Sequence, residues 1–165
     1  MPLGTTTTIP PTPKSFTENP DFVPFLQRVV RAHAVNDPLV QSDALTFASP
    51  AGATLFNTAT KRRAKKAAGI GGANFQGGTG GGGVGGWVHV YDQRGVPAFG
   101  RIADTEDIIG SLYVDGRGQI VDKETGGKWE ENRMYRLLTG ERGVCRLSSY
   151  LRDKVREALK DGNTQ

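Results

Sequence analysis

Residues 87–91 read WVHVY, and residues 108–114 read IIGSLYV. Both stretches are rich in β-branched and aromatic residues, which favour extended strands. Shorter apolar stretches follow at residues 119–121 and 134–139, with turn-forming residues between them. This succession predicts an antiparallel meander of four or five strands.

The first of these strands is apolar on both faces. Trp87, His89 and Tyr91 lie on one face, and Val88 and Val90 lie on the other. A strand of this kind is typical of the centre of a sheet.

Turn residues and polar residues set the strand limits. Residues 115–118 read DGRG, which indicates a hairpin. We expect a returning strand at residues 96–102 and a polar loop at residues 123–132.

Three helices are predicted around this sheet. Residues 22–34 carry apolar side chains at helical spacing after Asp21, and a second, short helix begins at Pro38 after the capping residue Asp37. The two would form an N-terminal helical hairpin. A C-terminal helix at residues 149–160 would cover one face of the sheet. Its N-cap is Ser148, and its predicted buried stripe consists of Leu151, Val155, Ala158 and Leu159.

The chain divides into four segments by composition. Residues 1–18 form a Thr- and Pro-rich tail that we expect to be disordered. Residues 19–60 form the N-terminal helical segment, and residues 61–86 form a basic and glycine-rich flexible linker or loop. Residues 87–162 hold the sheet and the C-terminal helix, which join residues 19–60 in one globular domain. The predicted fold class is α+β.

The formal net charge of +4 comes from one short run. It consists of Lys61, Arg62, Arg63, Lys65 and Lys66, and without it the chain would be close to neutral. Such a run can serve as a nuclear-import signal, as a contact to RNA or another polyanion, or only as a solvated segment. The sequence leaves these three uses open.

The sequence predicts no cofactor and no metal. A single cysteine, Cys145, excludes an internal disulfide and a cysteine-based zinc site. His33 and His89, the only histidines, lie far apart in the sequence. A GxGxxG pattern at residues 78–83 lacks the preceding strand and following helix of a dinucleotide site.

No secretory signal and no membrane-length apolar run is present in the sequence. We therefore expect a cytoplasmic or nuclear protein that does not enter a membrane. The oligomeric state stays open.

The function expected from the sequence is non-catalytic protein interaction, as an adaptor, a complex subunit or an assembly factor. A partner would bind the sheet face bearing Trp87, His89 and Tyr91, or a basic stripe on the last helix. That stripe consists of Arg152, Arg156 and Lys160.

Two alternatives remain. The first is single-stranded RNA binding, with the basic segment holding the backbone and the sheet aromatics stacking on bases. It requires Trp87, Tyr91, Tyr113 and Tyr135 to be exposed on one face. The second is a small hydrolase-like enzyme in which His89 would serve as base for Cys145, Ser148 or Ser149.

Overall fold

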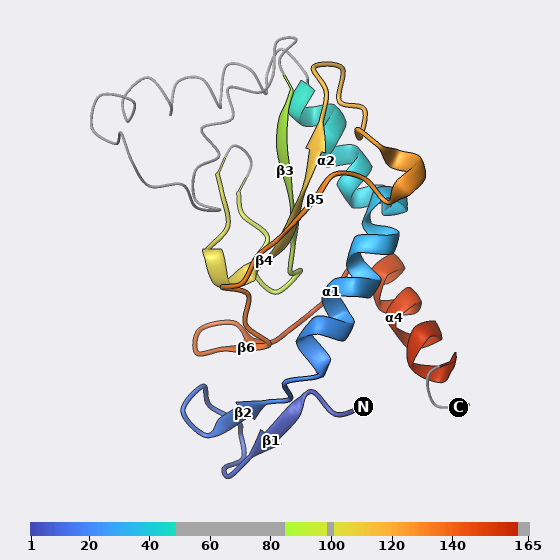
Figure 1. The fold of residues 1–165 in the computed structure, drawn as a ribbon. Helices are drawn as coiled ribbons and strands as arrows, with labels where there is room; N and C mark the ends of the chain where they lie inside the picture. The colour runs from blue at the N-terminus through green and yellow to red at the C-terminus, as the bar shows by residue number, and fades with distance from the viewer. Residues whose placement is uncertain (49–84, 99–100, 162–165) are drawn as a thin grey trace.

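The computed structural model describes residues 1–48, 85–98 and 101–161. It shows the predicted α+β class, with three α-helices, antiparallel strands and a C-terminal helix among the described residues (Figure 1). The basic run and most of the glycine tract lie outside the described residues.

Helices α1 (Phe22–His33) and α2 (Pro38–Ala48) begin where the sequence predicts. Asp37 caps α2, because its Oδ1 accepts the N–H of Leu39 at 2.9 Å. The two helices do not fold back as the expected hairpin. The short 3-10 helix η1 (Ala34–Asn36) prolongs the helical path instead of reversing it, so α2 follows α1 along one side of the sheet (Figure 1).

Among the described residues, the main sheet has three antiparallel strands in the order β3-β4-β5. They are β3 (Gly86–Tyr91), β4 (Ile108–Val114) and β5 (Trp129–Glu131). Within the part of the sheet that the structure describes, β4 is therefore the central strand, and residues 87–91 lie at an edge instead of at the predicted centre. The face of β3 that bears Val88 is apolar because α2 packs against it through Ala44 and Phe47.

The expected count of four or five strands in one sheet is corrected to three for residues 1–48, 85–98 and 101–161. Residues 96–98 and 101–102 of the predicted returning strand are loop, whereas β5 lies inside the predicted polar loop. The ring of Trp129 lies against Gly110, where any side chain would collide with it. This cross-strand contact stabilises β5 despite its polar sequence.

Four further strands in the described part of the chain form two small sheets. Strands β1 (Gly4–Thr6) and β2 (Phe16–Glu18) pair with each other, as do β6 (Leu138–Thr139) and β7 (Gly143–Val144). The residues of the tail predicted to be disordered thus form a hairpin. The ring of Phe16 lies close to Gly4 and packs against the main core, which gives this polar segment an apolar anchor.

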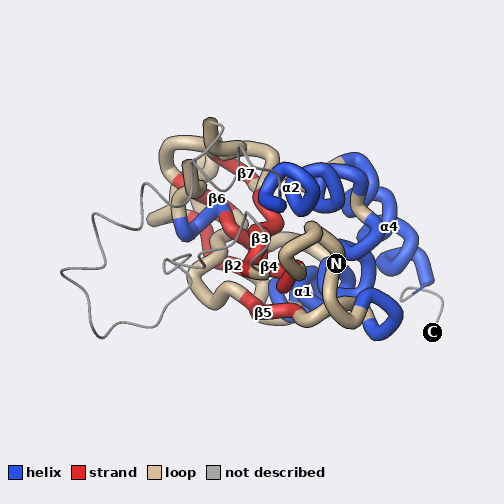
Figure 2. The backbone as a smooth tube through the Cα atoms, turned by 90° about the horizontal axis from the view of Figure 1, so that it is seen from above, coloured by secondary structure: helices blue, strands red, loops and turns tan. Residues whose placement is uncertain are grey.

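The core lies between the sheet and the helices. Leu26 and Val30 of α1 pack in one cluster with Leu112 of β4 and with Leu151 and Val155 of the C-terminal helix. Figure 2 shows the helices gathered on one side of the sheet.

Helix α4 (Ser149–Asp161) lies beside α1, and its predicted stripe is buried at Leu151 and Val155. Ser148 caps α4, because its Oγ accepts the N–H of Leu151 at 3.1 Å. The same hydroxyl donates to Oδ2 of Asp37 at 2.5 Å. The N-termini of α2 and α4 are therefore joined by this hydrogen bond between their capping residues.

Candidate functional site

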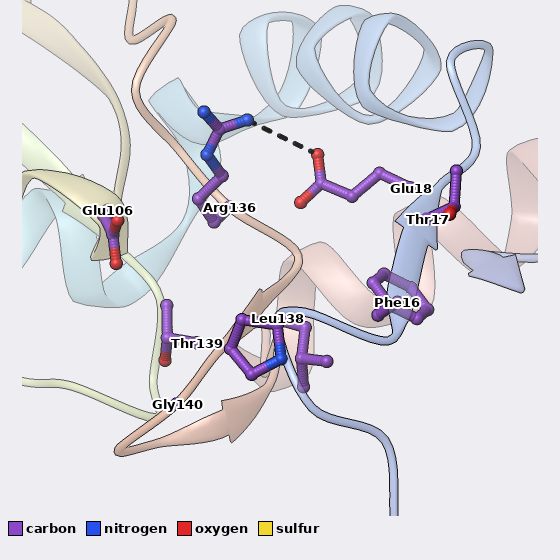
Figure 3. Close-up of a pocket in the computed structure, with 9 residues that line it drawn as sticks. Phe16, Thr17, Glu18, Glu106, Arg136, Leu138, Thr139 and Gly140 are labelled. Carbon is purple, nitrogen blue, oxygen red and sulfur yellow. Dashed lines mark ion pairs between the residues drawn. The ribbon is translucent and has the colours of Figure 1, made fainter. Parts of the chain in front are cut away.

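An open groove of about 440 Å³ lies between β2 and β6 (Figure 3). It is lined by Pro13, Phe16, Thr17, Glu18, Glu106, Arg136, Leu138, Thr139 and Gly140. The groove exists because the N-terminal hairpin packs beside the segment that leads into β6. It could not be predicted while residues 1–18 were expected to be disordered.

Glu18 fastens one wall of the groove to the other. Its Oε1 accepts the N–H of Leu137 at 2.8 Å, and its Oε2 lies 3.9 Å from Nη1 of Arg136. Figure 3 shows the Glu18 side chain reaching across toward Arg136.

Two other polar groups at the groove are unengaged. Glu106 is exposed, and its carboxylate forms no ion pair or hydrogen bond with any residue that the structure describes. The Oγ1 of Thr139 is buried without a hydrogen-bond partner. With two carboxylates and one guanidinium, the lining carries a net negative charge.

The sheet face predicted as a binding surface presents a different picture. Trp87 and Tyr113 are half-buried and pack edge to face, with ring centroids 5.3 Å apart. The ammonium group of Lys128 lies over both rings, 5.7 Å and 5.1 Å from their centroids. These rings are thus partly occupied by neighbours within the chain.

His89, on the same face, is buried, with 2% of its surface exposed. Its Nδ1 lies 2.7 Å from Oγ of Ser111, and its Nε2 has no hydrogen-bond partner. Burial lowers the pKa of His89 to about 4, so the ring is neutral at neutral pH. Sequence reasoning missed Ser111, whose position opposite His89 follows from the register of β3 and β4.

The contacts of His89 do not form a catalytic relay. Ser148, one predicted nucleophile, caps α4, and Cys145 lies near Tyr135 and Asp92. Among the described residues no carboxylate orients the ring of His89, which nucleophilic catalysis by a serine and a histidine ordinarily needs.

A buried ionic network surrounds Arg94. Its Nε donates to Oδ1 of Asp107 at 2.8 Å, and Asp92 lies 3.7 Å away. Its two terminal nitrogens donate to four backbone carbonyls, those of Glu106, Arg136, Leu137 and Gly143. The guanidinium is therefore fully used in joining the turn after β3 to the segment around β6.

The carboxylates of this network are also satisfied. Oδ2 of Asp92 accepts the hydroxyl of Tyr135 at 2.8 Å, and its Oδ1 accepts the N–H of Arg94 and of Arg146. Burial and the neighbouring Asp92 raise the pKa of Tyr135 well above its usual value. Asp107 binds Arg142 as well as Arg94. These groups hold the fold together and leave no atom for a substrate.

The remaining predicted site residues fall in two places. Arg152, Arg156 and Lys160 lie on the exposed side of α4, where Asp153 is 3.8 Å from Arg152 and 3.9 Å from Arg156. Lys61, Arg62, Arg63, Lys65 and Lys66 lie outside the described residues.

Of the four rings needed for RNA stacking, Tyr135 is buried at 2% exposure, whereas Trp87, Tyr91 and Tyr113 are half-buried. A single exposed face bearing all four rings is therefore not formed.

The described residues contain no group of three or more histidine, cysteine or acidic side chains placed to hold a metal ion. Within the parts of the chain that the structure describes, no helix has both the length and the hydropathy to cross a membrane. Compared with known proteins, the chain matches no family model, no curated protein and no solved structure.

Proposed function

We propose that this chain is a non-catalytic protein-interaction protein that receives an extended segment of a partner protein in the groove between β2 and β6. The observation that carries the proposal is the groove itself, whose opposite walls are strands with one neighbour each in the described sheets. Such strand edges are a common place for an incoming peptide to add as a further strand.

The hydrogen-bond pattern supports an open edge on each wall. The N–H of Asn19 bonds to the carbonyl of Leu3, and the N–H of Cys145 bonds to the carbonyl of Leu137. Antiparallel ladders alternate between bonded and non-bonded pairs. The backbone groups of Glu18 and Leu138 therefore point away from β1 and β7, where a further strand can bind them.

The state of the acid and base groups favours binding over catalysis. Asp92 and Asp107 are buried and bonded to cations, hydroxyls or amides. His89 is buried beside Ser111. The groove offers carboxylates and a guanidinium but no histidine or cysteine.

An array of random seven-residue peptides tests the proposal, with the wild-type protein and two variants as probes. Thr17→Trp places an indole on the exposed wall of the groove. Thr5→Trp is the matched control, because Thr5 pairs with Thr17 in register and is also exposed, but does not line the groove. We expect the wild type and the control to retain the same peptides and Thr17→Trp to lose them.

A second measurement does not depend on the variants. Amide hydrogen exchange of the wild type should show slower exchange at Leu138 when a retained peptide is added. The proposal is overturned if the array retains no peptide, or if peptides bind while the exchange of Leu138 and the binding of Thr17→Trp stay unchanged.

A further inference from the structure

We infer that the segment received by the groove is basic, with a lysine or arginine whose cation pairs with Glu106. This inference rests on the proposed function and names the chemistry of the partner. It is carried by the charge balance of the groove lining and by the way in which the fold presents Glu106.

The backbone of Glu106 is held rigidly while its side chain is unengaged. Its carbonyl accepts the N–H of Arg136 at 3.1 Å and a terminal N–H of Arg94 at 3.2 Å. It belongs to the 3-10 helix η2 (Thr105–Asp107), whose last residue is anchored by buried ion pairs. A carboxylate on an immobile backbone can form an ion pair with little loss of backbone entropy.

The arginines that contact the backbone of Glu106 or the acidic residues on either side of it pair with other carboxylates, and for Arg136 that carboxylate is Glu18. Arg94 binds Asp107 and backbone carbonyls. Arg142 binds Asp104 at 2.7 Å and also binds Asp107. Glu106 therefore remains uncompensated among the described residues, and an incoming cation would supply the missing charge.

An acidic segment fits the same groove less well. Arg136 is the cation of the lining, and it already lies 3.9 Å from Glu18. An incoming carboxylate would compete with Glu18, which also accepts the N–H of Leu137. It would in addition approach the negative charge of Glu106.

The test uses three pools of seven-residue peptides that are random except at the central position, which is Lys, Gln or Glu. Binding is measured to the wild type, to Glu106→Gln and to Glu124→Gln. Glu124 is an exposed carboxylate of the 3-10 helix η3 (Lys123–Thr125) that does not line the groove, so it serves as the matched control.

We expect the wild type and Glu124→Gln to prefer the Lys pool over the Gln pool by about three- to fivefold, the range of an exposed ion pair. Glu106→Gln should abolish this preference without changing its affinity for the Gln pool. The preference should also shrink at about 1 M salt, where exposed charges are screened.

Equal binding of the Lys, Gln and Glu pools to the wild type would overturn the inference, as would a preference that Glu106→Gln retains. The proposed function would survive either result, provided that Thr17→Trp still blocks the peptides. Loss of all peptide binding by the wild type would instead remove the proposed function.

Discussion

Acidification should destabilise this protein through His89, and the size of the effect follows from its burial. The folded-state pKa is lowered from 6.5 to about 4, because burial disfavours the charged form of the ring. Below pH 6.5 the unfolded chain binds a proton that the folded chain does not bind. Stability attributable to His89 is therefore present above pH 6.5 and is lost as the pH falls toward 4.

The linkage relation converts this shift into free energies. The unfolding free energy should fall by about 1 kcal/mol at pH 5.5 and by about 2 to 3 kcal/mol at pH 4.5, relative to pH 7.5. The full shift corresponds to about 3 kcal/mol well below pH 4. Carboxylates that titrate in the same range add their own contributions, so a variant must isolate the histidine.

The assay is urea unfolding of the wild type and of His89→Asn at pH 7.5, 5.5 and 4.5. Asparagine retains a polar group for Ser111 but does not titrate. The stability gap between the two proteins should therefore narrow by about 2 to 3 kcal/mol between pH 7.5 and 4.5. His33→Asn, which replaces the other histidine in the same way, is measured in parallel as the control.

A constant gap between the wild type and His89→Asn would refute this reasoning. So would a nuclear magnetic resonance titration in which His89 of the folded protein protonates with a midpoint near 6.5. Either result would mean that solvent or a partner reaches Nε2 in the folded state.

Three further predictions concern stability. Arg94→Lys keeps the charge but loses the planar set of donors, so urea titrations should show an unfolding free energy lower by about 3 to 5 kcal/mol. The control Arg117→Lys, at an exposed turn, should change the unfolding free energy by less than about 0.5 kcal/mol. Asp37→Ala removes the cap of α2 and the acceptor for the Ser148 hydroxyl, so calorimetry should show an unfolding free energy lower by about 2 kcal/mol or more. A decrease below about 0.5 kcal/mol would contradict the link between the two helices. Gly110→Ala places a methyl group against the ring of Trp129, so it should lower the unfolding free energy by about 1 to 3 kcal/mol and shift the tryptophan fluorescence. An unchanged fluorescence spectrum would show that the ring does not pack against position 110.

The helices could be predicted from the sequence because their signals are local. Asp37 and Ser148 cap the helices that follow them, and Leu151 and Val155 are buried at the spacing of one helix face. Each of these features depends on residues within one or two turns. A single sequence contains that information in full.

Strands whose pairing depends on distant residues could not be predicted in the same way. Strand β5 depends on the fit of Trp129 over Gly110, and the N-terminal hairpin depends on Phe16 and Gly4. In both cases a glycine makes room for a ring from another strand. The composition of either segment alone favours a loop.

In the candidate site, too, the local features could be predicted and the features that depend on distant residues could not. The sequence marks His89, Trp87 and Tyr91 as one face of a strand, and this alternation holds along most of β3. Ser111 becomes the partner of His89 only through the register of two strands that lie about twenty residues apart in the chain. The groove depends on the hairpin of β1 and β2, which could not be expected because the threonine- and proline-rich composition of residues 1–18 favours disorder.

The buried network and the groove are also connected through one side chain. Arg94 donates to the carbonyls of both Glu106 and Arg136, whose side chains line the groove. The spacing of these two opposite charges is therefore set by a guanidinium that is itself buried and fully bonded. A lysine at position 94 has no planar fork with which to hold both carbonyls at once. Loss of these hydrogen bonds should therefore change the position of Glu106 and Arg136 in the groove while the protein is still folded. We expect Arg94→Lys to weaken peptide binding at urea concentrations below its unfolding transition.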